Sequence, residues 1–124
     1  MNMIDVGCFL NKRFKERKDF SLDIYYPCVN NESVYTKYNN LEPLLKAINI
    51  SETGICFVSR ISLKEGDFIS FLNKIGNNPS FWCLSQVRWI RDFEKLQIVG
   101  CEFFLLNQNQ VEKIRSFIDA QMYL

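Results

Sequence analysis

The spacing of apolar residues constrains this chain most, because it changes from a period of two to a period of about 3.6 near residue 105. Before that point, apolar and polar side chains alternate in short segments that end at glycine, proline or asparagine, as is typical of strands and turns. Residues 41–48 fit either a short helical turn or a further strand. The predicted strands are residues 20–26, 33–38, 55–58, 67–72, 81–91 and 96–104.

The last apolar segment predicts a helix over residues 109–121. With 124 residues, the chain has room for one domain. The sequence therefore predicts a mainly β, single-domain fold: a small antiparallel β-barrel of about six strands with a C-terminal α-helix packed against it. The helix presents one apolar stripe with spacings of three and four, formed by Val111, Ile114, Phe117, Ile118 and Met122.

The residue types that the chain lacks exclude several kinds of chemistry. There is no histidine, which removes the commonest general base and metal ligand near neutral pH. The five cysteines are widely spaced and include no Cys-x-x-Cys pair, as expected for reduced thiols in a cytosol. No apolar run approaches the roughly 18 residues of a membrane span, and the first residues do not resemble a signal peptide. We therefore expect a cytoplasmic protein that is not an enzyme, holds no metal and has no membrane span.

The positive charge is concentrated in residues 11–18. This segment has five basic residues and one acidic residue, whereas the whole chain has a formal net charge of only +1. Such a segment is either a solvated face or a site for an anion such as phosphate. Duplex DNA is not expected as a partner, because the rest of the chain is net negative and would repel the phosphate backbone.

Two motifs make the anion site more specific. Arg13 and Arg17 lie four positions apart in the basic segment, and Asn49, Ser51 and Gly54 form an N-x-S-x-x-G motif further along the chain. In this order, the two motifs resemble those of the PilZ domain, the bacterial receptor module for cyclic di-GMP. The resemblance also includes the C-terminal helix and two later segments, a Val-x-Trp at residues 87–89 and a Gly-x-x-Phe at residues 100–103.

The resemblance covers residues 11–119 and implies the domain boundaries. The 31 residues that separate the two motifs exceed the usual spacing in the family, so we expect an extra loop, strand pair or helical turn there. The expected divisions are an N-terminal extension at residues 1–10 and a PilZ-like domain at residues 11–124, which contains the basic ligand-binding segment 11–18, an insertion at 27–48 and the helix at 109–121.

The chemistry of these residue types suits cyclic di-GMP, which has two singly charged phosphodiesters and two guanines. An arginine fork binds a phosphate or the O6/N7 edge of guanine, and its face stacks on a purine. The resemblance implies ligand contacts by Arg13, Arg17, Asn49, Ser51 and Gly54. In the structural alternative, the arginines pair with Glu16 or Asp19, and the Asn49 and Ser51 side chains only shape a turn.

Three further residues are candidates for a secondary role. Lys12 and Lys18 flank the arginines and would attract an anion from a distance, while Lys12 would also occupy the space of a second stacked nucleotide. A stoichiometry of two nucleotides per chain would contradict this role for Lys12. Strict alternation places Trp89 on one strand face with Cys83 and Val87, so it is either a core residue or a stacking platform.

The sequence thus predicts a cyclic di-GMP receptor that signals through ordering of its N-terminal segment. The expected partner is a protein of motility, adhesion or exopolysaccharide control. The first alternative is an adaptor of motility or pilus machinery with the same fold that does not bind nucleotide. A second alternative is a small barrel that binds single-stranded RNA through its aromatic side chains, which make up 15% of the chain.

Overall fold

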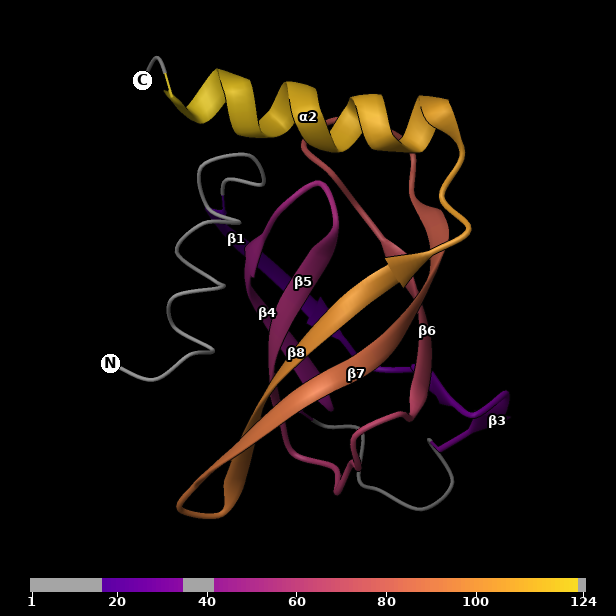
Figure 1. The fold of residues 1–124 in the computed structure, drawn as a ribbon, viewed down its shortest axis with the longest axis vertical. Helices are drawn as coiled ribbons and strands as arrows, with labels where there is room; N and C mark the ends of the chain where they lie inside the picture. Colours follow the sequence, from indigo (N-terminus) through magenta and orange to yellow (C-terminus); the bar gives the residue numbers. More distant parts are fainter. Residues whose placement is uncertain (1–16, 35–41, 123–124) are drawn as a thin grey trace.

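The computed structural model describes residues 17–34 and 42–122. These residues are mainly β and form eight strands followed by one helix (Figure 1). In chain order the elements are β1 (Lys18–Ile24), β2 (Cys28–Val29), β3 (Glu32–Ser33), β4 (Leu45–Ile50), β5 (Gly54–Ser59), β6 (Phe68–Asn73), β7 (Phe81–Phe93), β8 (Leu96–Phe104) and α2 (Gln108–Met122).

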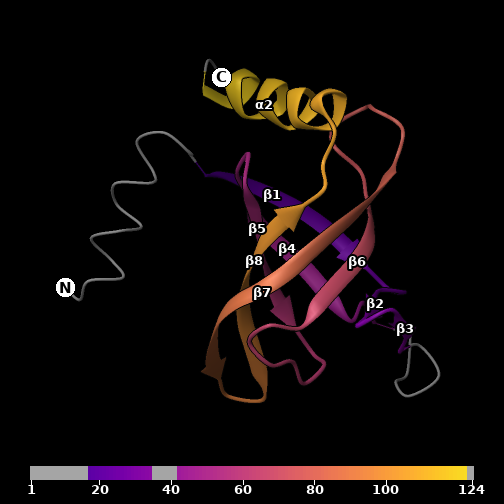
Figure 2. The same cartoon turned by 45° about the vertical axis from the view of Figure 1, so that its right-hand side comes forward.

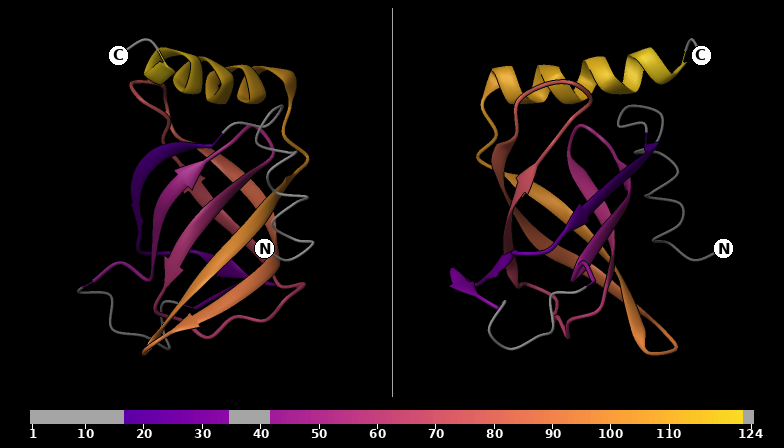
Figure 3. Two further views of the ribbon diagram at one scale, coloured as in Figure 1. Left: turned by 60° about the vertical axis from the view of Figure 1, so that its left-hand side comes forward. Right: turned by 180° about the vertical axis from the view of Figure 1, so that it is seen from behind.

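The eight strands form one antiparallel sheet that curls into a barrel-like shape. The strand order is β1-β4-β5-β8-β7-β6-β2-β3, and β1 returns to contact β6. Figure 2 and Figure 3 show this curvature, with the long β7–β8 hairpin extending beyond the end opposite α2. The predicted fold class, a mainly β antiparallel barrel with a C-terminal helix, is confirmed.

Six of the strands are long and two are very short. The ambiguous residues 41–48 contribute to strand β4, in which Leu45 and Ala47 are buried. Residues 45–48, which fall within the expected insertion, therefore belong to a central strand. The short strands β2 and β3 form a hairpin around Asn30 and Asn31, which both adopt a positive φ, as a two-residue turn of this kind requires.

The interior of the barrel is filled by side chains that alternate inward along the strands. The Phe57 and Phe71 rings are fully buried and meet edge to face, with centroids 5.2 Å apart. Each fully buried side chain of this size contributes about 1.5–3 kcal/mol to folding. Because one face of each long strand is committed to this core, the register of the sheet fixes which residues point outward.

Helix α2 covers one end of the barrel (Figure 1). The Asn107 side chain accepts a hydrogen bond from the Gln110 backbone N–H at 2.8 Å, and the Asn107 N–H donates to the Gln110 side chain at 3.1 Å. This reciprocal cap begins the helix at Gln108, one residue before the predicted start. Within the predicted apolar stripe, Ile114 and Ile118 are buried, and the Phe117 ring contacts the Phe20 ring.

A β-bulge in β7 changes the face on which Trp89 lies. Val87 pairs with Cys101 and Trp89 pairs with Gly100, so two steps along β7 match one step along β8. Cys83 and Val87 are buried in the core, whereas Trp89 lies over the outer side of Gly100. The prediction that Trp89 shares a face with Cys83 and Val87 is therefore wrong, because it assumes uninterrupted alternation.

Candidate functional site

The N-x-S-x-x-G motif lies on the hairpin between β4 and β5. The Ser51 N–H donates to the Gly54 carbonyl oxygen at 2.8 Å, which closes the turn. The Ser51 hydroxyl oxygen accepts from the backbone N–H groups of Gly54 at 3.2 Å and Thr53 at 3.3 Å. Ser51 is buried, with 3% of its surface exposed, so its hydroxyl stabilises the turn in this structure.

Gly54 allows β5 to approach β8 more closely than any other residue would. A Cβ atom at this position would lie 2.3 Å from the backbone carbonyl oxygen of Cys101, well inside van der Waals contact. The neighbouring Thr53 carbonyl accepts a hydrogen bond from the Phe103 N–H at 2.8 Å. The motif glycine is thus required by strand packing at the base of the turn.

Asn49 connects this motif to the basic segment. The Arg17 guanidinium donates a hydrogen bond from Nη1 to the Asn49 side-chain oxygen at 3.2 Å, although the residues are 32 positions apart. Asn49 is opposite Asp19 in the β1–β4 register, and no ion pair joins Arg17 to Asp19. The second arginine of the R-x-x-x-R pair and the first residue of the second motif therefore lie together on the outer face of the barrel.

A row of outward-facing residues continues from Asn49 across the sheet. The β-ladder register aligns Asn49 of β4, Cys56 of β5, Gly100 of β8 and Trp89 of β7. The two middle residues are small, and a Cβ on Gly100 would lie 2.1 Å from Nε1 of the Trp89 indole. The Trp89 indole therefore covers Gly100, and Cys56, which is 3% exposed, lies between the indole and the Arg17–Asn49 pair.

A second outward row lies beside the first and has a cation at each end. It aligns Lys46, Val58, Ile98 and Arg91. The Arg91 guanidinium carbon lies 5.9 Å from the centroid of the Trp89 ring, which is within cation–π distance. Together the two rows form a surface with an apolar centre and the cations Arg17, Lys46 and Arg91 around it. On β1 the same registers continue to the exposed carboxylates of Asp19 and Asp23. We call the eight residues of the two rows and Arg17 the outer platform.

Comparison with known families decides the identity of this fold. The family model of the PilZ domain matches residues 11–120, which is most of the chain. The chain belongs to the PilZ domain family. PilZ domains are receptor or adaptor domains rather than enzymes, and the family is associated with cyclic di-GMP binding.

Among solved structures, this PilZ domain is similar to the inhibitor of motility MotI/DgrA from Bacillus subtilis. The TM-score is 0.63 with 17% sequence identity, over 88% of this chain and 51% of that protein. The likeness concerns the fold, and this chain spans about half the length of MotI/DgrA. No curated protein matches the sequence.

Of the basic candidate residues not yet placed in this PilZ domain, Lys18 is the one that the structure describes. Lys18 lies in β1, beside Arg17 and opposite Ile50 in the β4 register. Arg13 and Lys12 lie outside the residues that the structure describes.

Arg91 carries a charge that the sequence motifs do not indicate. The sequence around Arg91 contains no motif that indicates a site. Its position at the site follows from its strand register and its contact with Trp89. Two other arginines form ion pairs. Nη2 of Arg88 lies 2.6 Å from a Glu102 carboxylate oxygen, and Nη2 of Arg60 lies 3.6 Å from a Glu42 carboxylate oxygen.

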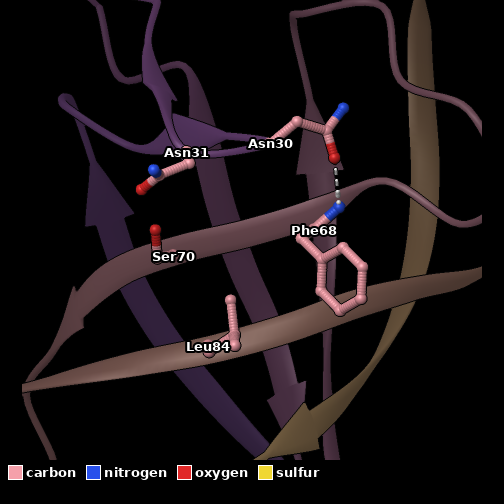
Figure 4. A pocket seen from close by; sticks show the side chains of 5 residues that line it. All are labelled: Asn30, Asn31, Phe68, Ser70 and Leu84. Atoms are coloured by element: carbon pink, nitrogen blue, oxygen red, sulfur yellow. Dashed lines mark hydrogen bonds between the residues drawn. The ribbon is translucent and has the colours of Figure 1, made fainter.

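A separate groove lies where the β2–β3 turn approaches the outer face of β6 and β7 (Figure 4). Its volume is about 500 Å³. The Asn30 side-chain oxygen accepts a hydrogen bond from the Phe68 N–H at 2.9 Å, which holds the turn over β6. None of the predicted site residues lines this groove; its lining residues are Asn30, Asn31, Phe68, Ser70 and Leu84.

Residues 17–34 and 42–122 also bear on two other functions, metal binding and membrane insertion. No three cysteine or acidic residues come together there in a way that could hold a metal ion. In the same residues, no helix has the length and apolar character needed to cross a membrane.

Proposed function

We propose that this PilZ domain is a receptor for cyclic di-GMP and binds it on the outer platform with Arg13, Arg17 and Asn49. The observation that carries the proposal is the hydrogen bond from Arg17 to Asn49, because it brings together the two motifs that the family uses for this ligand. Ser51 and Gly54 contribute by holding the turn that presents Asn49.

The remaining hydrogen-bonding capacity of these side chains matches the ligand. Arg17 uses one donor on Asn49 and has further donors for a phosphodiester oxygen. Asn49 accepts that bond with its oxygen, which leaves its amide NH₂ group to donate to the O6 or N7 atom of a guanine. Lys12 and Lys18 add positive charge that favours approach of the dianion.

The signal would pass to a protein partner through the basic segment. Ligand binding would order the part of the basic segment that precedes Arg17 over the outer platform, and the altered surface would be recognised by a component of motility, adhesion or exopolysaccharide control. The structural similarity to a protein named an inhibitor of motility supports a motility partner among these three. The receptor would act in the cytoplasm, where cyclic di-GMP is available.

Calorimetric titration with cyclic di-GMP tests the proposal. Wild-type protein should bind at micromolar ligand concentrations, and Arg17→Ala should weaken binding about tenfold or more, since it removes charge-assisted hydrogen bonds. Lys113→Ala is the control for loss of one positive charge, because Lys113 lies on helix α2 over the Phe81 ring and is not part of the outer platform. Absence of binding by the wild-type protein at tens of micromolar would reject the receptor function.

An adaptor that does not bind nucleotide is the second candidate, and exposed apolar side chains favour it. Leu72 and Trp82 are opposite each other on β6 and β7, with 49% and 59% of their surfaces exposed. Phe68 on the same face of β6 is also exposed. Such side chains suit contact with a protein, and a wild-type chain that binds a motility or pilus component but no cyclic di-GMP would establish this function instead.

A further inference from the structure

We propose that Arg91, supported by Trp89, is a further nucleotide-contacting arginine that reaches the ligand from the side of the outer platform opposite Arg17. This inference rests on the proposed function, and it adds a contact that belongs to neither motif. It also gives Trp89 a defined role, as the support that holds the Arg91 guanidinium at the edge of the platform.

The register of the sheet places Arg91 and Arg17 on the same outer face. Arg17 contacts Asn49 at the β4 end of the first row, and Trp89 forms the β7 end of that row. Arg91 follows Trp89 by two positions, so both side chains project from the same side of β7. The two guanidinium groups therefore lie on either side of Cys56 and Gly100, and the Trp89 indole covers Gly100.

The positive charges of Arg17 and Arg91 both affect the pKa of the Cys56 thiol. Cys56 is 3% exposed, yet its side chain points to the outer face and does not belong to the core cluster. Burial raises the pKa of the Cys56 thiol, and the positive charges of Arg17 and Arg91 oppose this rise. Both guanidinium groups thus act on the residue at the centre of the platform.

Arg91 differs from the neighbouring arginines in having no carboxylate partner. Arg88 is held by Glu102 and Arg60 by Glu42, whereas no described carboxylate lies within ion-pair distance of Arg91. Its contact among these residues is the Trp89 ring. A guanidinium held near an indole by a cation–π contact keeps its edge donors free for an anion, and a face of the group can stack on a purine.

The ligand has groups that could make such a second contact. Cyclic di-GMP carries two phosphodiesters and two guanines at opposite sides of one ring, so a single arginine pair on one side leaves half of these groups without a partner. Val58 and Ile98 provide an apolar floor beside the row of Cys56 and Gly100. A nucleotide lying on this floor would be held by Arg17 at one end and by Arg91 at the other.

Titration of Arg91→Met, Arg91→Lys and Arg88→Met variants with cyclic di-GMP tests the inference. Arg91→Met should weaken binding about tenfold or more, because it removes charge-assisted hydrogen bonds and stacking. Arg91→Lys should recover only part of this loss, since a lysine keeps the charge but lacks the planar fork. Arg88→Met is the matched control on the same strand and should stay within about twofold of wild type, because Arg88 is already paired with Glu102.

A fluorescence titration separates direct contact from a general charge effect. Trp82 and Trp89 are the two tryptophans, so in a Trp82→Phe background the emission reports Trp89 alone. Ligand should change this emission, and Arg91→Met should reduce the change at saturating ligand. If wild-type protein binds and Arg91→Met binds equally well, this inference fails while the receptor function stands. If wild-type protein does not bind, both fail.

Discussion

Gly100 lets the Trp89 indole rest directly on the backbone of β8, so the two residues form one packing unit. A Cβ on Gly100 would lie 2.1 Å from Nε1 and 2.2 Å from Cε2 of Trp89, which requires the ring to move. We expect Gly100→Ala to destabilise the protein by about 1–3 kcal/mol, as is typical of overpacking. Urea unfolding measures the change.

A double-mutant cycle with Trp89→Leu tests the cause of that loss. If the steric conflict is with the indole, Gly100→Ala should cost less in the Trp89→Leu background than in the wild type. An equal cost in both backgrounds would show that the effect comes from the β8 backbone. Strict alternation from Cys83 predicts Trp89 in the core, and no residue type near Arg88 signals the bulge that turns it outward. This contact was therefore not predictable from the sequence.

At the scale of elements, an ion pair connects the motif turn to helix α2. The Arg115 guanidinium donates from Nε to a Glu52 carboxylate oxygen, and this hydrogen bond, with the Glu52 charge, raises the pKa of Arg115. An arginine is protonated near neutral pH with or without this shift, so the shift does not change the charge of the pair there. We expect Glu52→Gln to lower the free energy of unfolding slightly, because an exposed pair in water is screened.

Salt dependence distinguishes this ion pair from ordinary packing. The coupling between Glu52→Gln and Arg115→Gln in a double-mutant cycle should shrink when salt is raised from about 0.05 M to about 0.5 M. Coupling that does not change with salt would rule out a Coulombic link. The sequence predicts the helix and strand β5, whereas it leaves residues 41–48 open between a helical turn and a strand. Asn107 and Gln110 mark where the helix begins. The sequence does not predict the ion pair, because the pairing depends on how α2 lies over the barrel.

At the scale of the whole molecule, the two faces of one sheet have separate tasks. The inner face forms a continuous core, and the sequence predicts it well because alternation and burial follow the same period. The outer face carries the candidate site, of which the sequence identifies Arg17 and Asn49 through motifs but not their contact. Cys56 and Arg91 could not be predicted as site residues from the sequence. Only the register of four strands places them on the same outer face as Arg17 and Asn49.

Because of the buried thiols, we expect the stability of the whole molecule to fall as the pH rises in the alkaline range. Burial raises the pKa of Cys83 to about 11 and that of Cys101 to about 12, from an ordinary value of 9.0. Well below pH 9 both the folded and the unfolded chain keep these protons, so ionisation of the thiols does not change the free energy of unfolding. Above that pH the unfolded chain releases them first, and the free energy of unfolding falls by up to about 1.4 kcal/mol per pH unit for each thiol.

Urea unfolding under reducing conditions, between about pH 8 and pH 10.5, measures this slope. A Cys83→Ala/Cys101→Ala variant should show a shallower decline than wild type, whatever its stability at neutral pH, because tyrosines and lysines titrate equally in both proteins. Parallel declines in the two proteins would show that these thiols ionise as readily in the folded barrel as in the unfolded chain. A shallower decline in the variant would show that burial in the folded barrel raises the pKa of these thiols above their value in the unfolded chain, so that the unfolded chain releases these protons first.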